Sequence, residues 1–196
     1  MKVQSSLEEF VRKVYGDCRR KGLAKAEVEH PWDVARFAHL DEIEEPFRRS
    51  SLYRVCLLHD VIEDHQEYTL SNLASRFHLS ERERHILCLL DRKDRDNTAY
   101  WRGIFSNTDA VRVKLADRVA NLRDLIAWMK AGGAQCPRCL EQARRYLEAN
   151  SIISALCDEM QPHPGTGGDV IGRLRAEVDE LCARLGKIMP GDHDRR

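Results

Sequence analysis

Four polar side chains stand together in the run His59-Asp60-Val-Ile-Glu63-Asp64, directly after an apolar stretch. On a continuous helix, Glu63 follows His59 by four residues and Asp64 follows Asp60 by four, so all four side chains project toward one region. Three acids near the C-terminal end of a helix oppose its dipole, at a cost of up to about 1 kcal/mol each. The run therefore indicates either a solvated acidic helix end or a site that holds a cation.

Two further pieces carry residues of the same chemical types. Lys114, Asp117 and Asn121 are spaced by three and four residues, on the face of a predicted helix that lies away from its apolar stripe. His30 stands before a proline, at the start of another predicted helix. Taken singly, the first piece is typical of a solvated helix face and the second of a capping histidine. Their meaning depends on whether the fold brings them together.

The elements that must position these residues are predicted to be helices. Apolar residues recur at spacings of three and four almost everywhere, and the alternation typical of half-buried strands is hardly seen. We therefore predict an all-α protein. Capping residues, prolines and glycines place the ends of the helices. The predicted helices cover residues 5–21, a stretch beginning at 30, residues 51–64, 70–77, 81–91, 108–130, 137–160 and 170–188.

The length of 196 residues favours one catalytic domain with an appendage. We predict a domain over residues 1–160, followed at 161–196 by a linker and an accessory C-terminal helix. Residues 161–168 have the Gly and Pro content of a turn or linker. The amphipathic helix beyond them is expected either to pack back on the domain or to support self-association as a homodimer.

The composition restricts the partners of the chain. Lys plus Arg equals Asp plus Glu at 32 each, so no excess of positive charge points to a DNA or RNA groove or to an anionic membrane surface. A small anionic substrate remains compatible with a local basic cluster. The N-terminal residues lack the apolar run of a signal peptide, and no run of about 18 apolar residues occurs. We expect a soluble, cytoplasmic protein without membrane contact.

The seven cysteines are predicted to be reduced, because most of them lie in helical apolar patterns. The pair Cys136-Pro-Arg-Cys139 has a spacing that suits zinc or redox chemistry. No second such pair follows, and only Cys157, Cys182 and His163 are available to complete a site. A helix that begins after Pro137 is the simpler interpretation.

The three pieces together resemble a known family. They stand in order as His30-Pro31, His59-Asp60-Val-Ile-Glu63-Asp64, and Lys114-Leu-Ala-Asp117 with Asn121. This pattern resembles the hydrolase domain of the RelA/SpoT alarmone enzymes, and in particular stand-alone small alarmone hydrolases of the metazoan SpoT homolog type. The resemblance covers roughly residues 5–130. It implies an HD-domain helical bundle that binds one Mn²⁺ through His30, His59, Asp60 and Asp117.

The resemblance also implies roles for other residues. Glu63 and Asp64 match the catalytic acidic pair of the family, which orients water and handles its proton. Arg20 and Lys21 match the basic stretch that grips the nucleotide base and phosphate. Asn121 is expected to contact the substrate sugar or the hydrogen-bond network of the site. Lys93, with Arg92 beside it, is a weaker candidate for phosphate contact.

The chain departs from its relatives at two places beside these residues. The approach to His30 reads Lys25-Ala-Glu-Val-Glu29, where relatives often have a Gly-Glu-Pro-Tyr type sequence, so base recognition is open to difference. His65 follows the acidic pair where many relatives have Thr. The metal ligands and the acidic pair themselves all match.

The function implied is Mn²⁺-dependent hydrolysis of the 3'-diphosphate of guanosine-3',5'-bis(diphosphate), (p)ppGpp, or of a related alarmone. One alternative is an HD-type phosphomonoesterase that acts on another nucleotide, such as NADPH or a nucleoside phosphate. Another is a nucleotide-binding protein without turnover. The metal residues do not separate the first two, because both reactions develop the same charge beside the ion.

Overall fold

The computed structural model describes residues 2–20, 22–92, 96–159 and 168–189, and it confirms the all-α prediction. The described residues contain no β-strand, and one isolated bridge joins Arg19 to Ala26. None of the described helices has both the length and the apolar composition needed to cross a bilayer. The α-helices are α1 (Lys2–Tyr15), α2 (Glu29–Phe37), α3 (Pro46–Leu58), α4 (Val61–Asp64), α5 (Leu70–Phe77), α6 (Glu81–Leu90), α7 (Asn97–Phe105), α8 (Thr108–Lys130), α9 (Pro137–Glu159) and α10 (Gly168–Ile188), with short 3-10 turns at Leu40–Glu42 and Gly133–Gln135.

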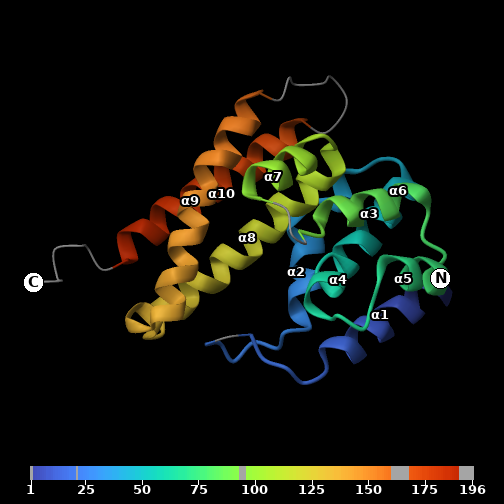
Figure 1. Ribbon diagram of the computed structural model, residues 1–196, viewed down its shortest axis with the longest axis horizontal. Coiled ribbons are helices and arrows are strands. Elements are labelled where there is room, and N and C mark those ends of the chain that lie inside the picture. The colour runs from blue at the N-terminus through green and yellow to red at the C-terminus, as the bar shows by residue number, and fades with distance from the viewer. Residues whose placement is uncertain (1, 21, 93–95, 160–167, 190–196) are drawn as a thin grey trace, which may run out of the picture.

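Helix α8 lies at the centre of the fold and packs against α2, α3, α6, α7, α9 and α10 (Figure 1). Most of its apolar residues are buried, as the stripe predicts, but Asp109, Arg112, Asp117 and Arg118 are buried as well. The face that carries Asp117 is therefore no solvated surface. A polar face that is enclosed by neighbouring helices can form a site.

The predicted helix over 51–64 is divided in two. Helix α3 ends at Leu58 and the short α4 begins at Val61, with His59 and Asp60 between them. Adjacent residues on a continuous helix point about 100° apart. The break, where Asp60 has φ −101° and ψ −9°, lets the two neighbouring side chains approach the same point.

The first helix is shorter than predicted. It ends at Tyr15 rather than at residue 21, and it begins at Lys2, so Ser5 and Ser6 are not its N-caps. The chain turns at Gly16, which has a positive φ of 51°. The following loop lies against the indole of Trp128, and a Cβ on Gly22 would be 2.0 Å from the indole Nε1. Only glycine allows this approach, which holds the loop against α8.

The predicted caps of α5 and α6 are confirmed. The Thr69 side chain accepts a hydrogen bond from the Asn72 amide at 3.2 Å, and the Asn72 side chain accepts one in return from the Thr69 amide. Ser80 and Glu83 form the same reciprocal pair at the start of α6. Each box satisfies two amides that the helix leaves without partners.

Helix α10 packs back on the domain, against α8 and α9, which is the first of the two arrangements expected for it. Leu174, Val178 and Leu185 on this helix are fully buried. Arg123 on α8 also donates to Glu177 on α10 at 2.5 Å. Most of the predicted linker lies outside the described residues, so the proposed domain boundary at residue 160 stays a prediction.

Asp109 near the start of α8 anchors two other helices. The buried carboxylate accepts hydrogen bonds from Arg48 of α3 at 2.7 Å and from Arg82 of α6 at 3.0 Å. We expect Asp109→Asn to lower the free energy of unfolding by about 1–3 kcal/mol, because both arginines lose their charge partner. Urea unfolding followed by circular dichroism measures this change. An unchanged midpoint would contradict the role given to Asp109.

Candidate functional site

The four predicted metal ligands meet at one point of the fold. His30 comes from α2, His59 and Asp60 from the break between α3 and α4, and Asp117 from α8. One ligand atom of each lies within 4.8 Å of all the others. The separations are 2.9 Å from His59 Nε2 to Asp60 Oδ2, 3.1 Å from His30 Nε2 to Asp117 Oδ1, 3.4 Å from His30 Nε2 to Asp60 Oδ2, and 3.6 Å from His59 Nε2 to Asp117 Oδ1.

The hydrogen bonds around the imidazoles fit a metal ion. The Nε2 atoms of His30 and His59 are buried and have no hydrogen-bond partner, although carboxylate oxygens lie near them. The opposite nitrogen of His59, Nδ1, lies 2.7 Å from the Cys56 carbonyl oxygen. A hydrogen bond from Nδ1 to that carbonyl leaves the Nε2 lone pair free and aimed at the cluster, which is the usual arrangement of a metal-binding histidine.

The charges of the imidazoles, the carboxylates and Lys114 interact strongly in this site. Burial disfavours a charged imidazole, but the carboxylates of Asp60 and Asp117 outweigh that effect and raise the pKa of His59 to about 10. Burial also disfavours a charged Asp117, yet Lys114 and the two imidazoles hold its pKa well below the usual range. Two carboxylates thus remain ionised in a buried space, where they attract a cation.

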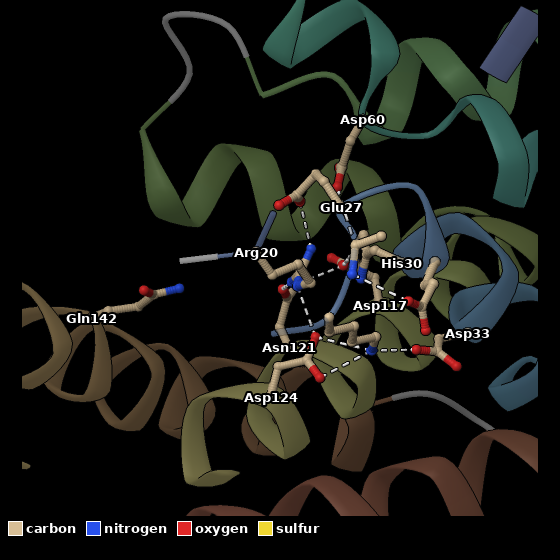
Figure 2. A network of polar contacts seen from close by, with 12 residues as sticks. Arg20, Glu27, His30, Asp33, Asp60, Asp117, Asn121, Asp124 and Gln142 are labelled. Carbon is tan, nitrogen blue, oxygen red and sulfur yellow. Dashed lines mark hydrogen bonds and ion pairs between the residues drawn. The ribbon is translucent and has the colours of Figure 1, made fainter. Parts of the chain in front are cut away.

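A chain of polar contacts supports Asp117 from behind (Figure 2). Its Oδ2 pairs with Lys114 Nζ at 2.8 Å, and its Oδ1 accepts from Asn121 Nδ2 at 2.5 Å. The Asn121 side-chain oxygen in turn accepts from Arg20 Nη2 at 2.6 Å. Asn121 therefore orients a candidate ligand as part of the hydrogen-bond network of the site, which is one of the two alternatives expected for it.

Arg20, expected to contact substrate, is already held by protein side chains. Figure 2 shows it between Glu27, Asn121 and Asp124. Its Nη1 lies 2.7 Å from Glu27 Oε1 and its Nε lies 2.7 Å from Asp124 Oδ2. Asp124 also accepts from Lys25 at 3.0 Å. Of the other basic candidates, Lys21 and Lys93 lie outside the described residues. The exposed Arg92 donates to the Asn97 side-chain oxygen at 2.7 Å.

The acidic pair Glu63 and Asp64 lies at the end of α4, beside the cluster. Both side chains are exposed and line the same cavity as Asp60 and Asp117. Burial raises the pKa of each carboxyl, and the charge of Asp60 raises it further. A carboxyl group with a raised pKa beside a metal site is suited to exchange protons with water.

Two adjoining cavities open beside the cluster. The larger has a volume of about 630 Å³ and lies between α7, α8, α9 and the acidic pair. The smaller, about 240 Å³, lies toward the loop that carries Arg20 and Glu27. Both are lined by Asp60, Asp64 and Asn121. The volumes suit a small organic ligand that reaches from the cluster in two directions.

The sequence interpretation missed several residues that line these cavities. Asp124 could have been predicted, because it lies three residues after Asn121 and seven after Asp117, on the same helix face. Arg118 and Trp128 on α8 gave no such signal. Gln142 comes from α9 and points toward Arg20 (Figure 2), a position that no local pattern indicates.

The Cys136 and Cys139 pair does not join the cluster. Cys139 is fully buried in the core near the start of α9, which agrees with the simpler interpretation of this segment. The metal-compatible group found among the described residues does not include either cysteine. His163, the nearest histidine in sequence, lies outside the described residues.

A scan against models of known protein families finds no match for this chain, and a search of curated proteins finds no matching relative. The function is therefore inferred from the geometry of the site and from the sequence pattern.

A metal ion bound at this cluster should stabilise the fold. We expect saturating Mn²⁺, at about 100 times its dissociation constant, to add about 2.7 kcal/mol. For a chain of this size, this corresponds to a rise in Tm of roughly 5–10 °C. Differential scanning calorimetry of chelator-treated protein, with and without added Mn²⁺, measures the shift. An equal Tm in both samples would contradict metal binding.

Proposed function

We propose that the chain is a metal-dependent phosphohydrolase of the HD type that removes the 3'-diphosphate from (p)ppGpp or a related alarmone. The observation that carries this proposal is the cluster of His30, His59, Asp60 and Asp117, with its buried and unbonded imidazole nitrogens. The sequence pattern supplies the choice of alarmone hydrolysis. The adjacent cavities leave room for a nucleotide substrate.

The donor set of two imidazoles and two carboxylates is a mixed nitrogen and oxygen set that suits Mn²⁺ or a similar divalent ion. When bound, such an ion lowers the pKa of water and stabilises negative charge on a phosphoryl oxygen. His30, His59, Asp60 and Asp117 would hold it. Lys114 and Asn121 keep Asp117 in place, because they occupy both of its oxygens from the side of α8.

The acidic pair performs the proton transfers in this mechanism. Asp64 and Glu63 stand at the rim of the cavity, where a water molecule has access to both carboxyl groups. One ionised carboxylate accepts a proton from the attacking water, and a protonated carboxyl supplies one to the leaving oxygen. A raised pKa makes each carboxylate a stronger base and increases the protonated fraction at a given pH, so it favours both steps.

The proposal is tested by incubating purified protein with Mn²⁺ and a panel of nucleotides: ppGpp, its adenosine counterpart, NADPH and nucleoside monophosphates. Release of pyrophosphate, together with the matching nucleoside 5'-diphosphate, is the expected result. Release of orthophosphate from NADPH or a monophosphate would instead identify a phosphomonoesterase. Binding of a nucleotide without any product would favour a non-catalytic binding protein.

A further inference from the structure

Arg118 on α8 is a buried cation in the wall of the larger cavity. Only 6% of the residue is exposed. Its guanidinium carbon lies 4.5 Å from the ring centre of Tyr146 on α9 and 5.4 Å from that of Trp101 on α7. In the part of the chain that the structure describes, no carboxylate forms an ion pair with Arg118 and no acceptor forms a hydrogen bond with it. All three side chains line the cavity.

A second buried arginine on the same helix shows what Arg118 lacks. Arg112 donates from Nε to the Ala38 carbonyl at 2.6 Å, and also to the carbonyl of His39. Burying a charge is costly unless it is paired and hydrogen-bonded. Contacts with aromatic rings stabilise a desolvated cation but satisfy none of its hydrogen-bond donors. The donors of Arg118 are thus left for a ligand in the cavity.

The two cavities differ in their charges. Among the described residues, the larger one is lined by four further cations, Arg92, Lys114, Arg138 and Arg145, and by six acids. Lys114 pairs with Asp117 and Arg145 pairs with Glu141. Arg138 forms no ion pair within the described residues, and it lines the same cavity from α9. In the smaller cavity the one arginine, Arg20, is neutralised by Glu27 and Asp124. The unpaired arginines Arg118 and Arg138 therefore favour an anionic group in the larger cavity, whereas the paired Arg20 favours none in the smaller.

We infer that Arg118 is the centre of an anion subsite that binds the phosphate group lying beyond the scissile bond of the substrate. A guanidinium group forks onto phosphate oxygens with two parallel hydrogen bonds. Trp101 and Tyr146 hold its plane in advance, which reduces the ordering cost of binding. The inference rests on the proposed function. It deepens that function by selecting substrates whose leaving group is a diphosphate over those that release a single phosphate.

The test uses inorganic pyrophosphate as the probe, titrated by calorimetry into the full chain after chelator treatment and desalting. Wild-type protein is expected to bind pyrophosphate, and Arg118→Met is expected to weaken binding by at least tenfold. The matched control is Arg123→Met, which removes an arginine from the same helix outside the cavity and should leave binding unchanged. Absence of binding by wild-type protein, or equal binding by Arg118→Met, overturns the inference.

Two further variants keep the test decisive if Arg118→Met fails to fold. Arg118→Lys preserves the charge but loses the planar fork, and Arg138→Met removes only an exposed arginine that lines the cavity. Each is expected to weaken pyrophosphate binding by threefold or more, and wild-type affinity in both would overturn the subsite.

The fate of the subsite can be separated from that of the proposed function, because the binding assay needs neither a metal nor turnover. If pyrophosphate binding depends on Arg118 but the protein hydrolyses no nucleotide, the subsite is supported and the proposed hydrolase function is rejected. If the protein hydrolyses ppGpp but its pyrophosphate binding does not depend on Arg118, only the subsite is rejected.

Discussion

Asp64→Asn is expected to lower the rate of pyrophosphate release by about 10²- to 10⁴-fold, the usual contribution of a general acid or base. The amide fills the same space but neither accepts nor donates the proton that the reaction moves. The side chain is exposed and does not belong to the four-residue cluster, so metal binding should be kept. Steady-state kinetics with ppGpp, together with titration of Mn²⁺ into the same variant, measures both effects.

The control for this variant is Glu67→Gln, an exposed acid in the turn after α4 that lines neither cavity. Its rate should equal that of the wild type. If Asp64→Asn turned over at the wild-type rate, Asp64 would have no part in proton transfer. A loss of metal from Asp64→Asn would mean that the residue supports the ion instead.

The elements of the fold could largely be predicted from the sequence, because their ends carry local signals. The caps at Thr69 and Ser80 and the glycines after Lys130 depend on hydrogen bonds and φ angles within a few residues. The predicted end of α1 was wrong, because both Gly16 and Gly22 can end a helix and the chain turns at Gly16. Gly22 is instead needed for a tertiary contact with Trp128. A local pattern does not show which of two glycines the fold uses.

The candidate cluster was found because its motifs are distinctive in residue type and order, and the structure does bring the four residues together. The break between α3 and α4 was not foreseen. Periodicity alone favoured a continuous helix through His59 and Asp60. The helix is interrupted there, and both side chains reach the same point, which is an arrangement that only the assembled fold fixes.

The wall of the larger cavity could not be predicted, because it depends on how α7, α8 and α9 pack. Arg118 follows Asp117 in sequence and resembles any basic residue on an amphipathic helix. It is buried only because Trp101 and Tyr146, from two other helices, enclose it. An apolar stripe identifies one packed face of a helix. The stripe does not indicate that other helices also pack against the remaining faces of α8.

Replacing Asp117, the candidate metal ligand on this enclosed helix, should have the largest effect. We expect Asp117→Asn to weaken Mn²⁺ binding by more than about a hundredfold, since even residues that only support ligands are worth about 10- to 100-fold in metal affinity. Turnover should fall below detection. Isothermal titration with Mn²⁺ and the ppGpp assay measure the two losses.

The matched control for Asp117→Asn is Asp109→Asn, which neutralises another buried carboxylate of α8, away from the cluster. Asp109→Asn should lose stability and keep its metal. Asp117→Asn should lose its metal under conditions where circular dichroism shows it folded. Wild-type Mn²⁺ affinity in folded Asp117→Asn would exclude Asp117 as a ligand. The ion would then have to be held by His30, His59 and Asp60 without the carboxylate of α8.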